Sequence, residues 1–155
     1  MNLQKFSPIT VIKWMWLWPP FWGAGIGLDE VSSDLRYIKV HMKLTWKNTN
    51  YVGTHFGGNL FSMTDPWYMF MFIHNLGNGY RVFDKAGDIQ FRKPGQGKVT
   101  AEFRLDQAVI DQVKQEMELN GKTEITLPVN IVNEQGEVVA EVKRTVWMAK
   151  KRIKS

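Results

Sequence analysis

The chain has 155 residues, of which 44% are hydrophobic, and carries a formal net charge of +5 from 20 basic and 15 acidic side chains. This size and composition fit one globular domain with a substantial core. The sequence contains no cysteine, which excludes disulfides, thiol catalysis and cysteine metal sites. Its basic residues are scattered along the chain, so no nucleic-acid partner is expected.

The first segment, residues 1–22, is rich in tryptophan and is expected to be helical. Lys13 interrupts its apolar stretch, and Pro19-Pro20 breaks the stretch before it reaches the thickness of a bilayer. We therefore expect no secretory signal, no stable membrane insertion and a cytoplasmic location. Three roles stay open for the segment: a helix packed on the domain or on a partner subunit, a lid over an apolar ligand, and an interfacial membrane anchor.

Most of the remaining chain has the pattern of β-strands. Apolar and polar side chains alternate strictly in the clearest cases, which is typical of a half-buried strand. Strands are expected at residues 36–46, 80–91, 99–105, 125–131 and 138–148. Turn-forming residues at 93–97 and 133–136 separate neighbouring strands and predict antiparallel hairpins.

Two segments are expected to be helices. The first begins near Phe56, is apolar on every side, and ends between residues 75 and 79. The second covers residues 107–119, with Asp106 as its N-cap and Gly121 as its stop. A long apolar helix followed by antiparallel strands predicts an α+β fold in which the sheet curls around that helix. We expect a helical segment at residues 1–22, one domain at residues 23–150, and a solvated basic tail at residues 151–155.

The candidate chemistry centres on Asp65, a single carboxylate within the apolar first helix. Enclosure of this helix by the protein would desolvate Asp65, and such a carboxylate is a candidate base or nucleophile where a cleft reaches it. The alternative is an acid that is satisfied by a neighbouring donor and has no chemical role.

The same helix opens with Gly57-Gly58, which leaves unpaired N–H groups and no side chains at its positive end. Such an end can serve as an oxyanion hole, although glycines here could also simply permit close packing. Gly58 and Asp65 would be about 10 Å apart along the helix, too far to act on one carbonyl carbon. A two-fold dimer with antiparallel helices would unite them across subunits, which predicts two shared sites per dimer.

The run from Gly53 to Asp65, Gly-Thr-His-Phe-Gly-Gly-Asn-Leu-Phe-Ser-Met-Thr-Asp, resembles the motif of hot-dog-fold thioesterases, notably the phenylacetyl-CoA thioesterase branch. Residues 80–86 and 88–91 resemble a bacterial group of hot-dog proteins catalogued only as a domain of unknown function. The likeness covers about residues 24 to 150. It implies a hot-dog fold, in which a curled antiparallel sheet wraps around a long central helix.

The resemblance further implies hydrolysis of an acyl-CoA thioester by a homodimer or homotetramer. Asp65 would attack the carbonyl or activate water, and Gly57 or Gly58 would bind the oxyanion. Asn50 occupies the position of an amide that orients the carbonyl or the water, although it also suits an ordinary turn. No separate cofactor is implied, because CoA is part of the substrate.

The chain departs from the family motif in three places. The common His-Gly-Gly is Phe56-Gly-Gly here, and His55 stands one position earlier as a candidate contributor. Met69 replaces a hydroxyl residue that some relatives use to hold water. Pro66 removes the N–H that would bond to the Ser62 carbonyl, which predicts a bend that re-aims Asp65.

Substrate contacts are assigned by residue type. Phe56, Phe61 and Met69 are candidates for contact with the acyl chain. Lys85 and Arg92 are candidates for contact with a CoA phosphate, and the alternative is that they are solvated charges at a strand edge. No metal site is expected. Two other functions stay open: a non-catalytic acyl-CoA or fatty-acid binding protein, and an acyl-thioester hydratase or dehydratase, which the absence of the motif histidine disfavours.

Overall fold

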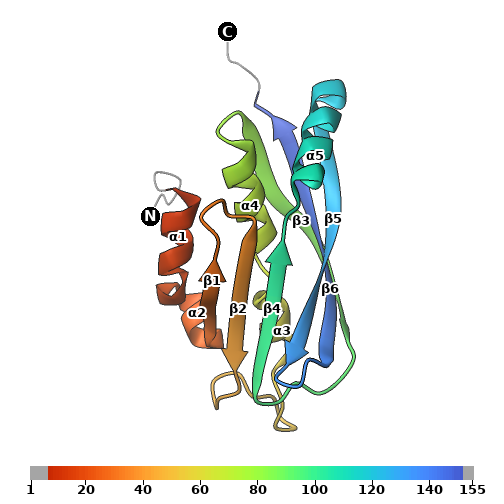
Figure 1. Cartoon of the computed structure of the whole chain (residues 1–155). Helices are drawn as coiled ribbons and strands as arrows, with labels where there is room; N and C mark the ends of the chain where they lie inside the picture. Colours follow the sequence, from red (N-terminus) through yellow and green to blue (C-terminus); the bar gives the residue numbers. More distant parts are fainter. Residues whose placement is uncertain (1–6, 152–155) are drawn as a thin grey trace.

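A single curled antiparallel sheet dominates the computed structural model, which describes residues 7–151 (Figure 1). Within that range the sheet has six strands in the order β1-β2-β4-β5-β6-β3. The strands are β1 Ile26–Val31, β2 Tyr37–Lys43, β3 Tyr80–Phe91, β4 Lys98–Arg104, β5 Lys122–Asn133 and β6 Val138–Lys150. Of the predicted basic tail, only Lys151 falls inside the described residues, and the rest lies outside them.

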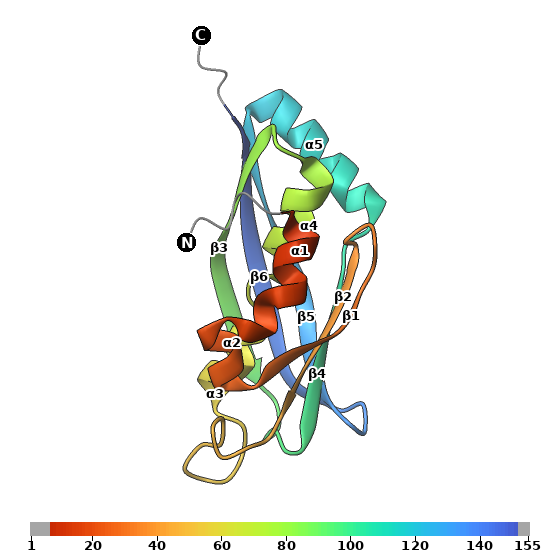
Figure 2. The ribbon, with the colours of Figure 1, turned by 90° about the vertical axis from the view of Figure 1, so that its left-hand side faces the viewer.

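The helices lie on the concave side and along one end of this sheet, as the two perpendicular views show (Figures 1 and 2). They are α1 Pro8–Trp14, the 3-10 helix η2 Met15–Leu17, α2 Pro19–Ala24, α3 Gly57–Ser62, α4 Trp67–Leu76 and α5 Gln107–Asn120. The sheet wraps around α4, so the predicted α+β arrangement is confirmed.

All five predicted strands are present, and the structure adds one that the alternation pattern missed. This strand, β1, pairs antiparallel with β2, and the register of the pairing shifts between Leu28 and Glu30. Its sequence lacks a clean alternation, because Gly27 occupies a position where a Cβ would come within 2.6 Å of the His41 ring. Gly27 is required because the His41 side chain approaches so closely. In a strand of only six residues, this one glycine is enough to obscure the alternation of apolar and polar side chains.

The predicted helix beginning near Phe56 is present over residues 57–76, and it is interrupted just before Pro66, where the sequence predicted a bend, so that the chain forms two helices there. α3 ends at Ser62 and α4 begins at Trp67. Pro66 has no N–H to donate to the Ser62 carbonyl, which instead accepts from the backbone N–H of Asp65 at 3.2 Å. Asp65 therefore lies in the break between the helices rather than within a helix.

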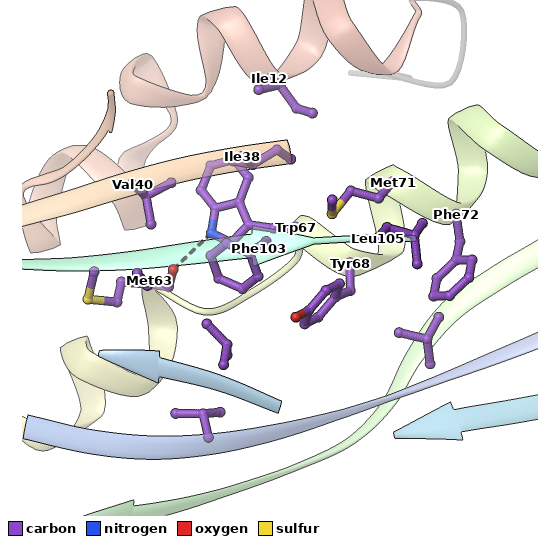
Figure 3. Close-up of a cluster of buried hydrophobic side chains, with 14 of the residues drawn as sticks. Ile12, Ile38, Val40, Met63, Trp67, Tyr68, Met71, Phe72, Phe103 and Leu105 are labelled. Atoms are coloured by element: carbon purple, nitrogen blue, oxygen red, sulfur yellow. Dashed lines mark hydrogen bonds between the residues drawn. The ribbon is translucent and has the colours of Figure 1, made fainter. Parts of the chain in front are cut away.

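The core is built around α4 and its aromatic side chains (Figure 3). The Trp67 ring lies 6.3 Å from that of Phe103 and 5.4 Å from that of Phe21, centroid to centroid. The Trp67 indole also donates a hydrogen bond of 2.8 Å to the carbonyl of Met63, in the break between α3 and α4. Ile12 and Phe21 are buried in the same core, so the N-terminal segment packs on the domain.

No helix among residues 7–151 combines the length and apolarity that crossing a bilayer requires.

The bond from Trp67 to Met63 yields a stability prediction. Trp67→Phe keeps an aromatic ring in the core but leaves the buried Met63 carbonyl without its indole donor. We expect a loss of about 1–3 kcal/mol in the free energy of unfolding, measured by urea denaturation. The matched control is Trp147→Phe, since the Trp147 indole donates no hydrogen bond within residues 7–151. Equal losses for the two variants would contradict a role for the Met63 bond.

Candidate active site

The glycine pair begins α3, as the sequence predicted. Phe56 is the N-cap in an extended conformation, and the helix starts at Gly57. A Cβ on Gly57 would lie 2.8 Å from the Phe91 ring, and one on Gly58 would lie 2.5 Å from the Phe56 ring. Neither glycine N–H donates a hydrogen bond to any group within the described chain. The pair thus serves the close packing of two rings and also leaves two N–H donors unused.

A hollow of about 630 Å³ lies beside this helix start. It brings together four of the predicted site residues, Asn50, His55, Gly57 and Arg92. The remaining lining residues are Val52, Thr54, Leu60, Phe91, Lys93, Pro94, Gly95 and Gln96. The hollow therefore combines a helix start, apolar side chains and two cations.

The Asn50 amide is fully used inside its own loop. Its Nδ2 donates to Thr54 Oγ1 at 2.9 Å and to the His55 carbonyl at 3.3 Å. Its Oδ1 accepts from the backbone N–H groups of Val52 at 3.1 Å and Thr54 at 3.0 Å. With both donors and both lone pairs engaged, Asn50 shapes the loop and has no spare group for a substrate.

His55 is buried, with 2% of its surface exposed, against the turn that precedes β4. Its Nε2 donates to the Gly97 carbonyl at 3.0 Å, since that carbonyl can only accept, and its backbone N–H donates to the Gly95 carbonyl at 2.9 Å. Burial lowers the pKa of His55, so the ring is neutral at pH 7. Its Nδ1 is then an acceptor, and it has no partner within the described residues.

The sequence predicted that Asp65 would be desolvated, and this is wrong, because 48% of its side chain is exposed. Its Oδ2 accepts from the guanidinium of Arg144 on β6, a side chain that is only 5% exposed. The guanidinium also lies over the Phe61 ring, with its central carbon 5.1 Å from the ring centroid. The break between α3 and α4 leaves the carboxylate at the protein surface, where Arg144 holds it.

A second carboxylate, Asp84 on β3, faces the same guanidinium. Its Oδ2 lies 3.8 Å from Arg144 Nη2, and its side chain is 14% exposed. Burial raises the pKa of Asp84 to about 6, and the negative charge of Asp65 adds to this effect. We call Asp65, Asp84 and Arg144 the aspartate cluster. Gly87 makes room for it, because a Cβ there would lie 3.0 Å from Arg144 Nη1.

Sequence reasoning missed the other two members of the aspartate cluster, Arg144 and Asp84, although a signal for them exists. On β6 the buried side chains Val142, Val146 and Met148 alternate with exposed or partly exposed ones, and Arg144 falls in the buried series. A charged residue at an inward strand position requires a partner inside the fold. Asp84 likewise follows Val82 on the inward side of β3, opposite Val146.

The other candidate residues are dispersed. Phe56 is 54% exposed at the helix start, and Phe61 belongs with the aspartate cluster. Arg92 lines the hollow, but its guanidinium pairs with Glu141 at 2.6 Å. Lys85 does not lie near the hollow, since it pairs with Glu124 on the solvent-exposed face of β5.

Met69 on α4 is partly buried. In the described part of the chain, no group of three or more His, Cys, Asp or Glu residues is arranged to hold a metal ion.

The helix start and the aspartate cluster lie at opposite ends of α3. Six residues of helix span about 9 Å, and Asp65 lies beyond the far end. One chain therefore presents a pair of free N–H donors at one place and a surface carboxylate at another. If both acted on one substrate, the N–H donors would supply an oxyanion hole and the carboxylate would supply a base or nucleophile.

Comparisons with known proteins agree with this architecture. The family model described as "Domain of unknown function (DUF4442)" matches residues 9–148. No curated protein matches the chain.

Three similar solved structures differ widely in sequence. A Pseudomonas aeruginosa protein of unknown function, PA5026, described as a "Probable Thioesterase", is 23% identical with a TM-score of 0.80, over 93% of this chain and 97% of that one. Thioesterase HI1161 from Haemophilus influenzae is 14% identical with a TM-score of 0.67, over 94% and 92%. The PaaI protein of the E. coli phenylacetic acid degradation operon is 19% identical with a TM-score of 0.64, over 94% of each chain. These likenesses confirm the predicted hot-dog fold.

The shifted pKa of Asp84 yields a pH-dependent stability prediction. Its folded pKa of about 6 exceeds the ordinary 3.8, so the folded chain binds this proton more tightly than the unfolded chain. The contribution of Asp84 to stability is therefore present at low pH and is lost as the pH rises through about 6. Asp84→Asn removes this loss. When the pH is raised from 4.5 to 7.5, we expect the free energy of unfolding of the variant to increase by about 1–2 kcal/mol relative to that of wild type.

Urea denaturation at the two pH values measures this gain. Asp111→Asn, at an exposed position on α5, is the control with the same chemical change and should leave this difference unchanged. A variant-to-wild-type difference that is the same at both pH values would contradict the assignment.

Proposed function

The chain belongs to the family described as "Domain of unknown function (DUF4442)", and on that premise we propose that it is an acyl-CoA thioesterase. The observation that carries the proposal is the half-exposed Asp65 carboxylate, held by Arg144 just beyond a helix that begins with two free glycine N–H groups. Two of the similar structures described above are named as thioesterases, one of them as probable, which supports the same reaction class.

We infer a homodimer formed through β3. This strand has 12 residues, lies at one edge of the sheet, and pairs only with β6 within residues 7–151. A long edge strand of this kind is a template for pairing with another chain. The exposed Phe91 at the end of this strand and the exposed Phe56 at the start of α3 add apolar surface that a partner would cover.

Pairing of β3 with its own copy would complete the site. Phe91 packs on Gly57, and Asp84 belongs to the aspartate cluster, so β3 contacts both half-sites. A two-fold axis between Gly87 and Asp88 sets Phe91 of one subunit opposite Asp84 of the partner subunit. The glycine pair of each subunit then approaches the partner's Asp65. The dimer holds two such shared sites.

In the proposed reaction the thioester carbonyl oxygen accepts hydrogen bonds from the N–H groups of Gly57 and Gly58. Asp65 of the partner subunit attacks the carbonyl carbon or removes a proton from the attacking water. Arg144 holds Asp65 through Oδ2, and Oδ1 accepts no hydrogen bond within the described residues. Oδ1 is thus the atom placed for the chemistry.

The substrate class follows from the surroundings of the hollow. Its apolar wall of Leu60, Val52 and Phe91 suits an acyl chain, and Arg92 and Lys93 at its rim suit phosphate groups. Both cations already pair with acids, Arg92 with Glu141 and Lys93 with Glu137. A CoA phosphate would compete for these exposed pairs, which are worth little in water.

A second candidate is non-catalytic binding of acyl-CoA or a fatty acid. It is favoured by the Asn50 amide, which has no spare donor or acceptor, and by Phe56 at the position of the motif histidine. Binding without turnover would distinguish it from the thioesterase.

The first test is the release of free CoA from a panel of short, long and aromatic acyl-CoA thioesters. We expect wild type to hydrolyse at least one class, and Asp65→Asn to lose about 100-fold or more, because it keeps the size of Asp65 but removes the base or nucleophile. Asp111→Asn, with the same chemical change at an exposed position on α5, should retain activity. Circular dichroism and the elution volume check that each variant folds and assembles. Binding without CoA release by wild type would support the second candidate.

The shared site has its own test by subunit complementation. Asp65→Asn and Gly58→Leu each remove one half-site, and we expect each variant alone to be inactive. In a mixed dimer, one site carries both defects and the other carries neither. Refolding equal amounts together should therefore restore about a quarter of the wild-type activity. No recovery, with mixed dimers verified by a tag on one subunit, would place each site within a single chain.

A further inference from the structure

Exposed tryptophans cover the outside of the N-terminal segment and the start of the loop between β2 and α3. Their exposed fractions, with that of one leucine, range from 46% to 85%. We call this surface the aromatic face, and it consists of Trp14, Trp16, Leu17, Trp18, Trp22 and Trp46. The ribbon views show the helices that carry these residues beside β1, and the loop between β2 and α3 at the end of the molecule where α2 lies (Figures 1 and 2).

The aromatic face is fixed to the domain rather than loosely attached. Ile12, Met15 and Phe21, from the same three short helices, are buried in the core. Phe21 contacts Trp67 inside and Trp18 outside, at ring distances of 5.4 and 5.5 Å. The segment therefore uses one side for packing, and its tryptophans project on the other. Core packing does not account for them.

The charged residues in the sequence segments that form the aromatic face are all basic. The Lys47 ammonium lies 4.0 Å from the centroid of the Trp22 ring and 5.9 Å from that of Trp46, and Lys13 is exposed on α1. Residues 1–28 and 35–64, which include the whole face, contain no Asp or Glu, so all 15 acids lie elsewhere in the sequence. A surface that is apolar, aromatic and cationic complements an anionic partner.

The indoles of the aromatic face also have unused hydrogen-bond donors. Among residues 7–151, the only indole N–H that donates a hydrogen bond is that of Trp67 in the core. Tryptophan concentrates at membrane interfaces because its ring enters the apolar region while its N–H reaches carbonyl and phosphate oxygens. Lysines beside such rings place their ammonium groups at the level of the lipid phosphates.

A second copy of the chain fits this face poorly. A two-fold interface would set the aromatic face against itself and bring Lys13 and Lys47 toward their own copies without an acid to neutralise them. The face also lies beside β1, at the opposite edge of the sheet from β3. Pairing through β3 would leave it uncovered.

We propose that the aromatic face docks the protein on the surface of an anionic lipid bilayer. The indoles lie among the headgroups, and Lys13 and Lys47 contact the lipid phosphates. The protein is held at the surface and does not span the bilayer. The proposal rests on the N-terminal segment and is independent of the reaction proposed above.

The test is co-sedimentation of the full chain with vesicles. One set contains equal parts of phosphatidylcholine and phosphatidylglycerol, and the other contains phosphatidylcholine alone. We expect the protein to bind the anionic vesicles, to bind the neutral ones more weakly, and to dissociate as salt is added.

Two double variants remove the two components of the face. Trp16→Ser with Trp22→Ser should weaken the partition coefficient about tenfold or more, through lost apolar contact. Lys13→Glu with Lys47→Glu should weaken it about twentyfold or more, through lost attraction to the lipid charge.

Matched controls make the same changes elsewhere. Leu119→Ser removes an exposed apolar side chain that lies outside the face and away from β3. Lys122→Glu with Lys143→Glu changes the net charge by the same amount at two exposed strand positions. We expect each control to bind within about twofold of wild type, because only contacts near the bilayer contribute strongly.

Three results would overturn the proposal. The first is no sedimentation of wild type with anionic vesicles, and the second is equal weakening by the face variants and their controls. The third is a fall in oligomer mass for Trp16→Ser with Trp22→Ser, measured by light scattering after gel filtration, which would make the face an interface between copies of the chain. Circular dichroism of every variant establishes that it is folded.

Discussion

The ion pair between Arg144 and Asp65 joins the sheet to the break in the central helices. Arg144 occupies an inward position of β6 and is almost fully buried, so its charge requires a carboxylate inside the fold. Because the Asp65 carboxylate is half exposed, solvent screens this ion pair, and its contribution to stability is modest. The pair is therefore better understood as a device that fixes the position of Asp65. Asp84 is the member whose charge is least favourable, because it is buried and lies near the negative charge of Asp65, which agrees with its raised pKa.

The break at Pro66 makes this ion pair possible and also links it to the core. An uninterrupted helix would keep Asp65 among apolar side chains, whereas the break exposes half of the carboxylate and leaves it beside β6. The backbone acceptor at Met63 that the break leaves free is satisfied by the Trp67 indole. Trp67 in turn packs on Phe21 of α2. The position of the candidate catalytic acid and the seating of the N-terminal segment thus depend on the same aromatic side chain.

Features that follow from local periodicity could be predicted from the sequence, and features that depend on tertiary contacts could not. The strands were predicted because side chains alternate with a period of two, and α5 was predicted from its cap and stop residues. β1 lacks the alternation, since Gly27 lies under the His41 ring from β2. The exposure of Asp65 depends on Pro66 and on Arg144, which is 79 residues away in the sequence. The saturated hydrogen bonding of Asn50 is likewise a property of a loop conformation, which residue types alone do not specify.

The two edges of the sheet differ in a way that unites the two proposals. At the β1 edge, the N-terminal helices fill the space beside the core and present their tryptophans outward. At the β3 edge, a 12-residue strand has no neighbour on one side within the described chain, and both half-sites lie against it. A site assembled at β3 and a surface contact made beside β1 do not compete for the same area. Because the loop from β2 to α3 carries Trp46 at one point and Val52 at another, the aromatic face and the hollow are joined by a single short connection.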